Sequence, residues 1–126
     1  MSYDLTLPLP EKGVTVPIFA SFTGHKKVPF WAVATNSAGP RLRFFGDEVE
    51  LKVIKTHRRL WSDVTHVDAY CGWKTNNLTL DFAGTPWNFT ANLVLPRYLR
   101  EALMFLNAKG LVLSARARVI MESNAS

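Results

Sequence analysis

Alternating apolar and polar residues predict several short β-strands in this chain. The clearest alternation covers residues 49–53, where valine and leucine alternate with charged residues. That period of two is typical of a strand with one buried face. Residues 78–82 (LTLDF) repeat it, and a Gly-Thr-Pro turn at 84–86 leads into WNFTAN. We therefore expect residues 78–92 to form a β-hairpin.

Further apolar runs extend the β pattern. PFWAVAT at 29–35 is rich in β-branched and aromatic residues, NSAGP predicts a turn, and RLRFF follows at 41–45, so this pair is expected to form a hairpin. In a later run, Val64 and Val67 are three residues apart, which predicts a β-bulge. Short strands separated by turns about every ten residues predict a meandering antiparallel sheet that is closed or nearly closed.

The two ends of the chain have a different pattern. Residues 1–27 mix prolines with apolar residues, which predicts an extended leader that packs over the domain. PRYLREALMFLNAKG at 96–110 has an apolar stripe, a proline at its start and a glycine placed to end it, so we expect an amphipathic helix. Residues 111–126 fit either an alternating edge strand or a short helix capped by Ser114.

The composition is that of one ordered globular domain. The chain has 126 residues, of which 48% are hydrophobic and 20% charged, a balance that argues against a disordered tail. Its single cysteine, Cys71, cannot form an internal disulfide, and the N-terminus lacks a signal-peptide pattern, so we expect a reducing, cytoplasmic setting. No apolar run approaches the ~18 residues of a transmembrane segment. The net charge of +5 favours weak attraction to anionic lipid or nucleic acid.

Four stretches follow one another in a recognisable order. They are RLRFFGDEVELKV as a hairpin, WSDVTHV as the start of a further strand, LTLDFAGTPWNFTAN as a second hairpin and PRYLREALMFLNAKG as a helix. From about residue 28 to residue 110 this order resembles the pleckstrin-homology-like (PH-like) superfold, especially its small bacterial members. The resemblance implies a mainly β fold, in which a bent antiparallel sheet or barrel is capped by one C-terminal amphipathic helix.

The resemblance also divides the chain and implies a general role. Residues 1–27 are the extended leader, residues 28–110 the PH-like domain and residues 111–126 a C-terminal extension. Either addition would cover a barrel edge or build a dimer contact. Members of the superfold bind lipids, peptides or other proteins, so the resemblance implies a binding scaffold without chemistry of its own.

Basic residues on the first predicted strands form one candidate site. The lipid-binding branch of the superfold holds phosphoinositide heads with a lysine near the end of the first strand and a basic-x-Arg pair on the second. Lys26 or Lys27 precedes the first run here, and Arg41 and Arg43 open the second, on one strand face. Forked guanidinium donors suit phosphate. The alternative, which we favour, is a solvated strand face.

The segment KTHRRLW at 55–61 raises the same choice. As a site, Lys55, His57, Arg58 and Arg59 would supply cations and Trp61 a surface for a lipid interface or a stacked base. Alternatively, Trp61 begins the next strand and packs inward, while the cations keep a hairpin loop in water. The position of the segment between two strands favours this solvated bend.

Adjacent aromatic residues indicate a covered outer surface. Most aromatic residues lie inside apolar runs and are expected in the core, but Phe44 and Phe45 must face opposite ways, as must Phe30 and Trp31. One residue of each pair therefore needs cover from the leader or from another subunit. We expect a homo-oligomer.

Catalytic chemistry has little support in the sequence. No nucleophile elbow, phosphate-binding glycine loop or zinc-ligand spacing is found, so we predict no catalytic residue, metal or cofactor. His66 and Asp68 share a strand face and would form a shallow dyad or a metal contact, although a surface ion pair is the simpler reading. Cys71 is expected to be a small, semi-buried residue.

The function that we predict is a non-catalytic binding module for a protein or peptide partner, part of a self-associating unit. It would dock an extended segment at the barrel edge or in the groove beside the helix. The alternative is a binder of anionic lipid head groups or single-stranded nucleic acid through Arg41, Arg43, Arg58 and Arg59. A small enzyme built on His66 and Asp68 is the least favoured hypothesis.

Overall fold

The computed structural model describes residues 3–25, 28–36, 39–53 and 55–123, with the backbone alone described for residue 25 and residues 28–36. Over these residues the elements run in the order β1 (Val14–Thr15), β2 (Ile18–His25), β3 (Val28–Asn36), β4 (Arg41–Phe44), β5 (Glu48–Lys52), β6 (Thr56–Leu60), a 3-10 turn (Trp61–Asp63), β7 (Val64–Gly72), β8 (Thr75–Phe82), β9 (Trp87–Leu93), α1 (Pro96–Ala108) and α2 (Ala115–Glu122). The predicted fold class, a mainly β domain with a C-terminal helix, is confirmed, with the short α2 in addition.

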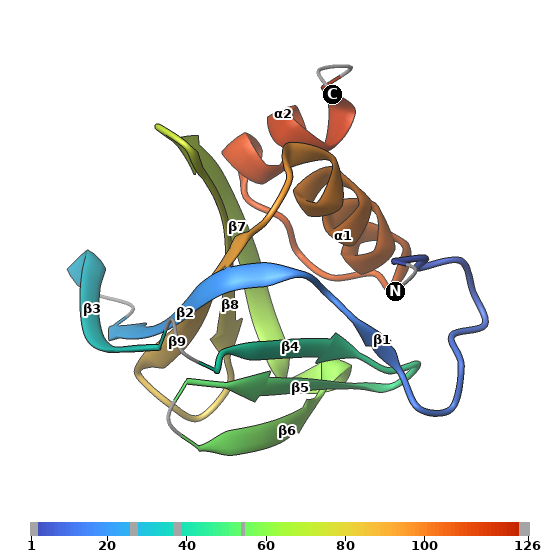
Figure 1. Ribbon diagram of the computed structural model, residues 1–126, viewed down its shortest axis with the longest axis horizontal. Coiled ribbons are helices and arrows are strands. Elements are labelled where there is room, and N and C mark those ends of the chain that lie inside the picture. Colours follow the sequence, from blue (N-terminus) through green and yellow to red (C-terminus); the bar gives the residue numbers. More distant parts are fainter. Residues whose placement is uncertain (1–2, 26–27, 37–38, 54, 124–126) are drawn as a thin grey trace.

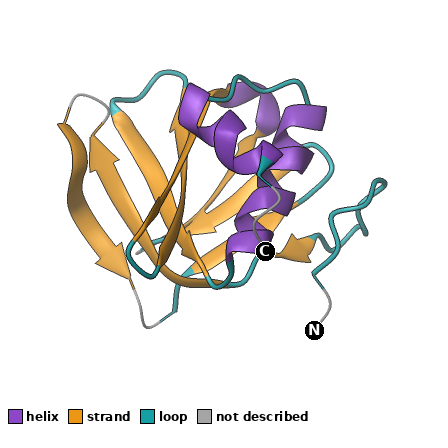
Figure 2. Ribbon diagram, turned by 90° about the horizontal axis from the view of Figure 1, so that it is seen from above, coloured by secondary structure: helices purple, strands orange, loops and turns teal. Residues whose placement is uncertain are grey.

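The strands form two antiparallel sheets, one in the order β1-β4-β5-β6 and the other in the order β3-β2-β9-β8-β7. In Figure 1, β4, β5 and β6 run across the lower part of the molecule, whereas β7, β8 and β9 rise steeply toward the helices. Seen from above in Figure 2, the described helices gather over one end of the strands and leave the other end without a helix.

The core lies between the two sheets and α1. The ring centroids of Phe44 and Trp61 are 5.0 Å apart, and Phe105 of α1 lies 5.4 Å from Phe44 and 5.7 Å from Trp61. Strand alternation explains this placement, since Leu42 and Phe44 of β4 are buried while the two arginines of that strand face away. Aromatic pairs in these orientations add to the stability gained by burial alone.

Helix α1 confirms the predicted amphipathic helix. The helix begins at Pro96, and proline suits this position because the first N–H groups of a helix make no hydrogen bond within it. Gly110 follows its end with a φ of 86°, a conformation that favours glycine. Among the described residues, no helix is long and apolar enough to cross a membrane. The buried stripe of α1 consists of Leu99, Ala102, Leu103, Phe105 and Leu106.

Within residues 3–25, strands occupy part of the expected leader. β1 pairs with β4, and β2 lies inside the five-stranded sheet between β3 and β9, so strand pairing crosses the expected boundary between residues 27 and 28. The prolines that predicted irregular structure lie between or before these strands, where they block no ladder hydrogen bond. Residues 3–13 do cover the domain: the hydroxyl of Tyr3 donates to the carbonyl of Tyr98 on α1, and the two rings are 4.8 Å apart.

Two expectations about the strands were wrong, whereas residues 37 and 38 of the expected NSAGP turn lie outside the described residues. β3 pairs with β2 and not with β4, so residues 29–45 are no hairpin and the chain passes from one sheet to the other between β3 and β4. Residues Thr56–Leu60, expected as a solvated bend, form β6 and pair with β5 along their whole length. Residue types predict that a run is a strand, but the pairing partner is decided by tertiary packing. THRRL looked like a loop because polar residues occupy both of its faces.

Other expectations of the β pattern are confirmed. Residues 48–52 form β5, and β8 and β9 form the expected hairpin. The pairing of β7 with β8 shifts register between Val64 and His66, as the three-residue spacing of Val64 and Val67 predicted. The bulge keeps both valines in the core, where they are buried.

The C-terminal extension is a helix that follows a short edge segment. Ser114 caps α2 by accepting a hydrogen bond from the Ala117 N–H at 3.1 Å, so the capped-helix alternative is confirmed. Just before α2, the Val67 N–H donates to the Val112 carbonyl and the Ser114 N–H donates to the Val67 carbonyl. The extension therefore covers part of the edge of β7, which was one of its two expected roles.

Candidate functional site

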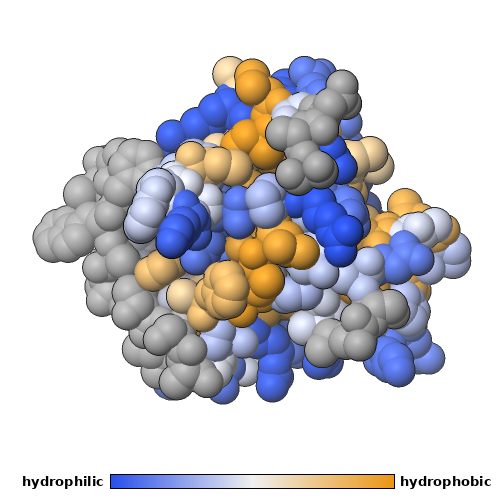
Figure 3. Space-filling model, turned by 45° about the horizontal axis from the view of Figure 1, so that its top comes forward, coloured by the Kyte–Doolittle hydropathy of each residue, from blue (hydrophilic) through white to orange (hydrophobic). Residues whose placement is uncertain are grey.

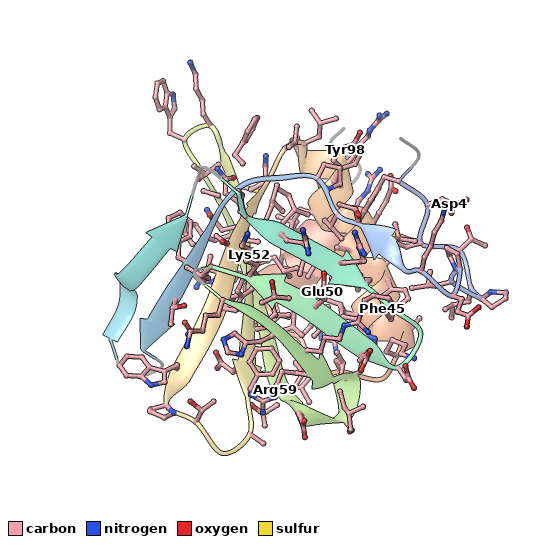
Figure 4. The ribbon with its side chains drawn as sticks, turned by 60° about the horizontal axis from the view of Figure 1, so that its bottom comes forward. Asp4, Phe45, Glu50, Lys52, Arg59 and Tyr98 are labelled. Carbon is pink, nitrogen blue, oxygen red and sulfur yellow. The ribbon has the colours of Figure 1, made fainter. Side chains whose placement is uncertain are left out.

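The outer face of the four-stranded sheet brings several of the predicted cations together. Arg41 and Arg43 share this face, as expected, and Arg58 of β6 reaches it as well. At its centre Glu50 is only 5% exposed, and its carboxylate accepts hydrogen bonds from Arg41 Nη1 at 3.4 Å and from Arg58 Nε at 3.2 Å. Figure 4 shows Glu50 on this face between Lys52 and Phe45.

A second carboxylate completes this cluster. Arg58 Nη1 donates to Glu48 at 2.8 Å, and the Arg58 guanidinium lies 4.4 Å from the centre of the Phe45 ring. Phe45 points to the outer face, whereas its neighbour Phe44 points into the core. These contacts cover Phe45, which is therefore buried as well. With Gly13 packed closely against the Phe45 ring, the N-terminal segment supplies part of the cover that the adjacent aromatics required. On the outer face, Arg41 and Arg58 are thus paired with carboxylates, whereas the buried Nε of Arg43 has no hydrogen-bond partner among the described residues.

Strand β6 carries a second set of cations on its other face. His57 pairs with Leu51 and Arg59 pairs with Val49 across the sheet, and paired residues share a face. Leu51 and Val49 are buried, so His57 and Arg59 lie on the inner face, and Lys55 lies at the next alternate position before the strand. The structure therefore divides the predicted basic segment: Arg58 points outward, whereas Lys55, His57 and Arg59 line the opposite side.

This inner side opens into a groove at the end of the sheets away from the helices. The groove, called here the β6 groove, has a volume of about 440 Å³ and lies between β6, the end of β5, the β8–β9 turn and β2. Its described lining residues include three basic side chains and no acidic one. They are Thr23, Leu51, Val53, Lys55, His57, Arg59, Phe82, Thr85, Trp87, Asn88 and Phe89. The apolar members form its walls and floor, with the cations along one rim.

Arg59 is held in place at one end of the groove. Its Nη2 donates to the Ala83 carbonyl at 3.2 Å, its Nε lies 3.7 Å from the Asp63 carboxylate, and its guanidinium lies 4.8 Å from the centre of the Phe82 ring. Figure 4 shows Arg59 beside the turn that joins β8 and β9. Among the described residues, the side chains of Lys55 and His57 make no hydrogen bond or ion pair, so both are available to a ligand.

Trp61, one of the predicted ligand-binding residues, does not line the groove. Trp61 is 4% exposed, and its Nε1 donates to the Phe45 carbonyl at 2.8 Å, so its role as a ligand surface was wrong and its inward packing is confirmed. Lys27 lies outside the described residues, as does Lys26.

His66 and Asp68 do not form the dyad that was considered. The Asp68 carboxylate accepts hydrogen bonds from Ser114 Oγ at 2.6 Å and from Arg116 Nε at 2.7 Å, whereas His66 pairs across the sheet with Asp81. Burial acts to raise the pKa of Asp68, but its hydrogen bonds to Arg116, Ser114 and the Ala69 N–H, with the charge on Arg116, outweigh burial and lower that pKa. Asp68 thus fixes the start of α2 to β7.

The remaining chemistry-bearing residues are dispersed. Within residues 3–24, 39–53 and 55–123, no three His, Cys, Asp or Glu side chains lie close enough to hold a metal ion. Cys71 is exposed, which corrects the expectation that it is semi-buried. It lies near the tip of the β7–β8 hairpin, where Trp73 is 85% exposed and stacks with the Lys74 ammonium at 4.6 Å.

Exposed apolar residues also occur on the helical side of the molecule, part of which is turned forward in Figure 3. There, apolar groups lie in separate areas with hydrophilic side chains between them. Met104, Val112 and Val119 are the exposed apolar residues of α1, the following loop and α2. The β6 groove is distinguished from these areas because its apolar walls enclose a volume and its cations share one rim.

No protein-family model matches this chain, and no curated protein matches it either.

Sequence reasoning found the cations of the groove but missed its walls. Leu51, Val53, Phe82 and Phe89 were expected in the core, and they are buried, yet they also line the hollow. One signal was available: the alternate spacing of residues 55, 57 and 59 places three cations on one strand face. Reading the segment as a loop removed that signal.

Proposed function

We propose that this protein is a non-catalytic binding module that docks an extended peptide segment of a partner protein along the edge of β6. The observation that carries the proposal is the position of the β6 groove beside an edge strand. Among the described residues, no strand pairs with the second edge of β6. Main-chain groups on such an edge can pair with an added strand.

Strand addition would use both the main-chain edge of β6 and the groove beside it. Alternate side chains of an added strand point to the same side, so every second residue of a docked peptide would face the groove. A volume of about 440 Å³ is in the range of ligand pockets and accommodates an aromatic side chain with its neighbours. The main chain would supply affinity and the groove would select the side chains.

The second hypothesis, binding of anionic lipid or nucleic acid through Arg41, Arg43, Arg58 and Arg59, has weaker support. Arg41 and Arg58 are ion-paired with Glu50, and Arg58 also with Glu48, so an incoming phosphate would have to displace carboxylates. Self-association and membership of the PH-like superfold stay predictions.

An NMR titration tests the proposal. The probe is the acetylated and amidated peptide Thr-Glu-Thr-Phe-Thr-Glu-Thr, added to ¹⁵N-labelled protein. We expect saturable amide shifts along β6 and around the groove. Two N-methylated analogues identify strand addition, because an added strand uses the N–H groups of alternate residues only. One analogue is N-methylated at the threonines and the other at the Glu and Phe residues. One of the two should fail to bind, and the other should bind as the unmodified peptide does. The proposal would be rejected if both N-methylated peptides bound equally well. It would also be rejected if no saturable shift appeared at about 2 mM peptide, which corresponds to very weak binding.

A further inference from the structure

We infer that the segment docked on β6 is acidic, with carboxylates at alternate positions on either side of an apolar anchor. This inference rests on the proposed function and names the class of peptide that the β6 groove selects. It follows from three features of the groove: the spacing of its cations, the absence of carboxylates among its described lining residues, and its apolar floor.

The spacing of the cations matches that of a strand. Lys55, His57 and Arg59 are two residues apart, and successive residues on one face of a strand are about 6.6 Å apart. The groove-facing side chains of a docked strand would have the same repeat. Carboxylates on alternate residues of the peptide can therefore each meet a cation on the rim.

Two of the three basic side chains of the groove, Lys55 and His57, have no acidic partner among the described residues, whereas Arg59 lies 3.7 Å from the Asp63 carboxylate. None of the groove's described lining residues is acidic. The opposite face of the same strand provides the contrast, since Arg58 there is paired with both Glu48 and Glu50. On the groove side of the same strand, by contrast, Lys55 and His57 have no described anionic partner, and an acidic peptide would supply the complementary charge.

The floor of the groove requires an apolar anchor in addition to the charges. Leu51 and Val53 from one sheet meet Phe82 and Phe89 from the other beneath the cations. A peptide with acidic residues alone would leave these walls in water, whereas an aromatic side chain between two carboxylates would fill the space. Arg59 stacks on Phe82 and so marks the boundary between the apolar floor and the charged rim.

A set of four peptides tests the inference by fluorescence anisotropy. The parent sequence is Thr-Glu-Thr-Phe-Thr-Glu-Thr. In the other three, both glutamates are replaced by glutamine, both are replaced by lysine, or the phenylalanine is replaced by alanine. The test variant carries the two substitutions Lys55→Gln and His57→Gln. The control variant is Arg118→Gln, which removes an exposed cation away from the groove. Neither Lys55 nor His57 has a described contact whose loss would unfold the protein.

We expect the glutamine peptide to bind about three- to tenfold more weakly than the parent, as the loss of two exposed charge pairs predicts, and the lysine peptide more weakly still. The alanine peptide should also lose at least fivefold. The double variant should remove the preference for glutamate over glutamine, while Arg118→Gln keeps it. Binding of the glutamine peptide as tightly as the parent, with shifts still on β6, would overturn this inference and leave the proposed function standing. Absence of binding by all four peptides would overturn both.

Discussion

Replacing Trp61 with phenylalanine separates a core role from a ligand role for this residue. The indole Nε1 donates to the Phe45 carbonyl inside the protein, and the ring packs against Phe44 and Phe105. The substitution leaves that carbonyl unpaired, at a cost of about 1–3 kcal/mol. The smaller ring also leaves a void, which adds about 1 kcal/mol. We therefore expect Trp61→Phe to lower the free energy of unfolding by about 2–4 kcal/mol.

Urea denaturation followed by circular dichroism measures this loss. At a slope of about 2 kcal/mol per molar urea, the midpoint should fall by about 1–2 M. Trp73→Phe is the matched control, because the same change at a side chain that is 85% exposed should alter stability by less than about 0.5 kcal/mol. Below the unfolding transition, the Trp61 variant should bind the acidic peptide as the wild type does. A change in unfolding free energy under 0.5 kcal/mol, or selective loss of binding in a fully folded variant, would refute the reasoning.

Three further expectations concern other parts of the fold. Asp68 has a lowered pKa in the folded state, so its contribution to stability is present above its unfolded pKa of about 4 and is lost as the pH falls through the folded value. The difference in stability between wild type and Asp68→Asn, measured by thermal unfolding, should therefore be constant from pH 7 to 5 and shrink below pH 4. A difference that stays constant down to pH 2.5 would show that the Asp68 carboxylate does not stabilise the fold. Gly13→Ala should lower the free energy of unfolding by at least about 1 kcal/mol more than Gly84→Ala does. Both glycines have a positive φ, but of the two only Gly13 has other atoms close to the position of a new Cβ, the nearest at 2.8 Å. Equal losses of unfolding free energy in urea would argue against close packing at Gly13. Glu50→Gln should strengthen retention on a heparin column by releasing paired arginines, and unchanged retention would show that they are not held by Glu50.

The pattern of alternation predicted most elements of this fold but only some of their pairings. The β8–β9 hairpin, the bulge after Val64 and helix α1 each have a local signal in turn residues, spacing or an apolar stripe, and each is confirmed. β3 has an equally clear strand composition, yet it joins β2, a strand hidden in a segment that its prolines marked as irregular. Because β2 directly precedes β3 in the chain, this pairing was missed through the failure to recognise β2 as a strand, not because its partner is remote.

The same limit applies to the candidate site. Seven cations and Trp61 were predicted without knowledge of which of them share a face. The inward packing of Trp61 could be anticipated from the sequence, although Trp61 begins a 3-10 turn and not the next strand. The pairing of Arg41 and Arg58 with Glu50, in contrast, depends on a three-strand register that only the fold provides. The walls of the groove were missed because residues such as Phe82 and Phe89 serve the core and the hollow at once.

The most direct test of the account is an isotope-filtered NOE experiment on labelled protein with the unlabelled acidic peptide. If the peptide adds to β6 with its aromatic anchor in the groove, its phenylalanine ring will show contacts to the methyl groups of Leu51 and Val53, and its main chain will show contacts to the main chain of residues 55–60. Ring contacts to Met104 or Val119 on the helices, with none to Leu51 or Val53, would place the peptide elsewhere and contradict the account.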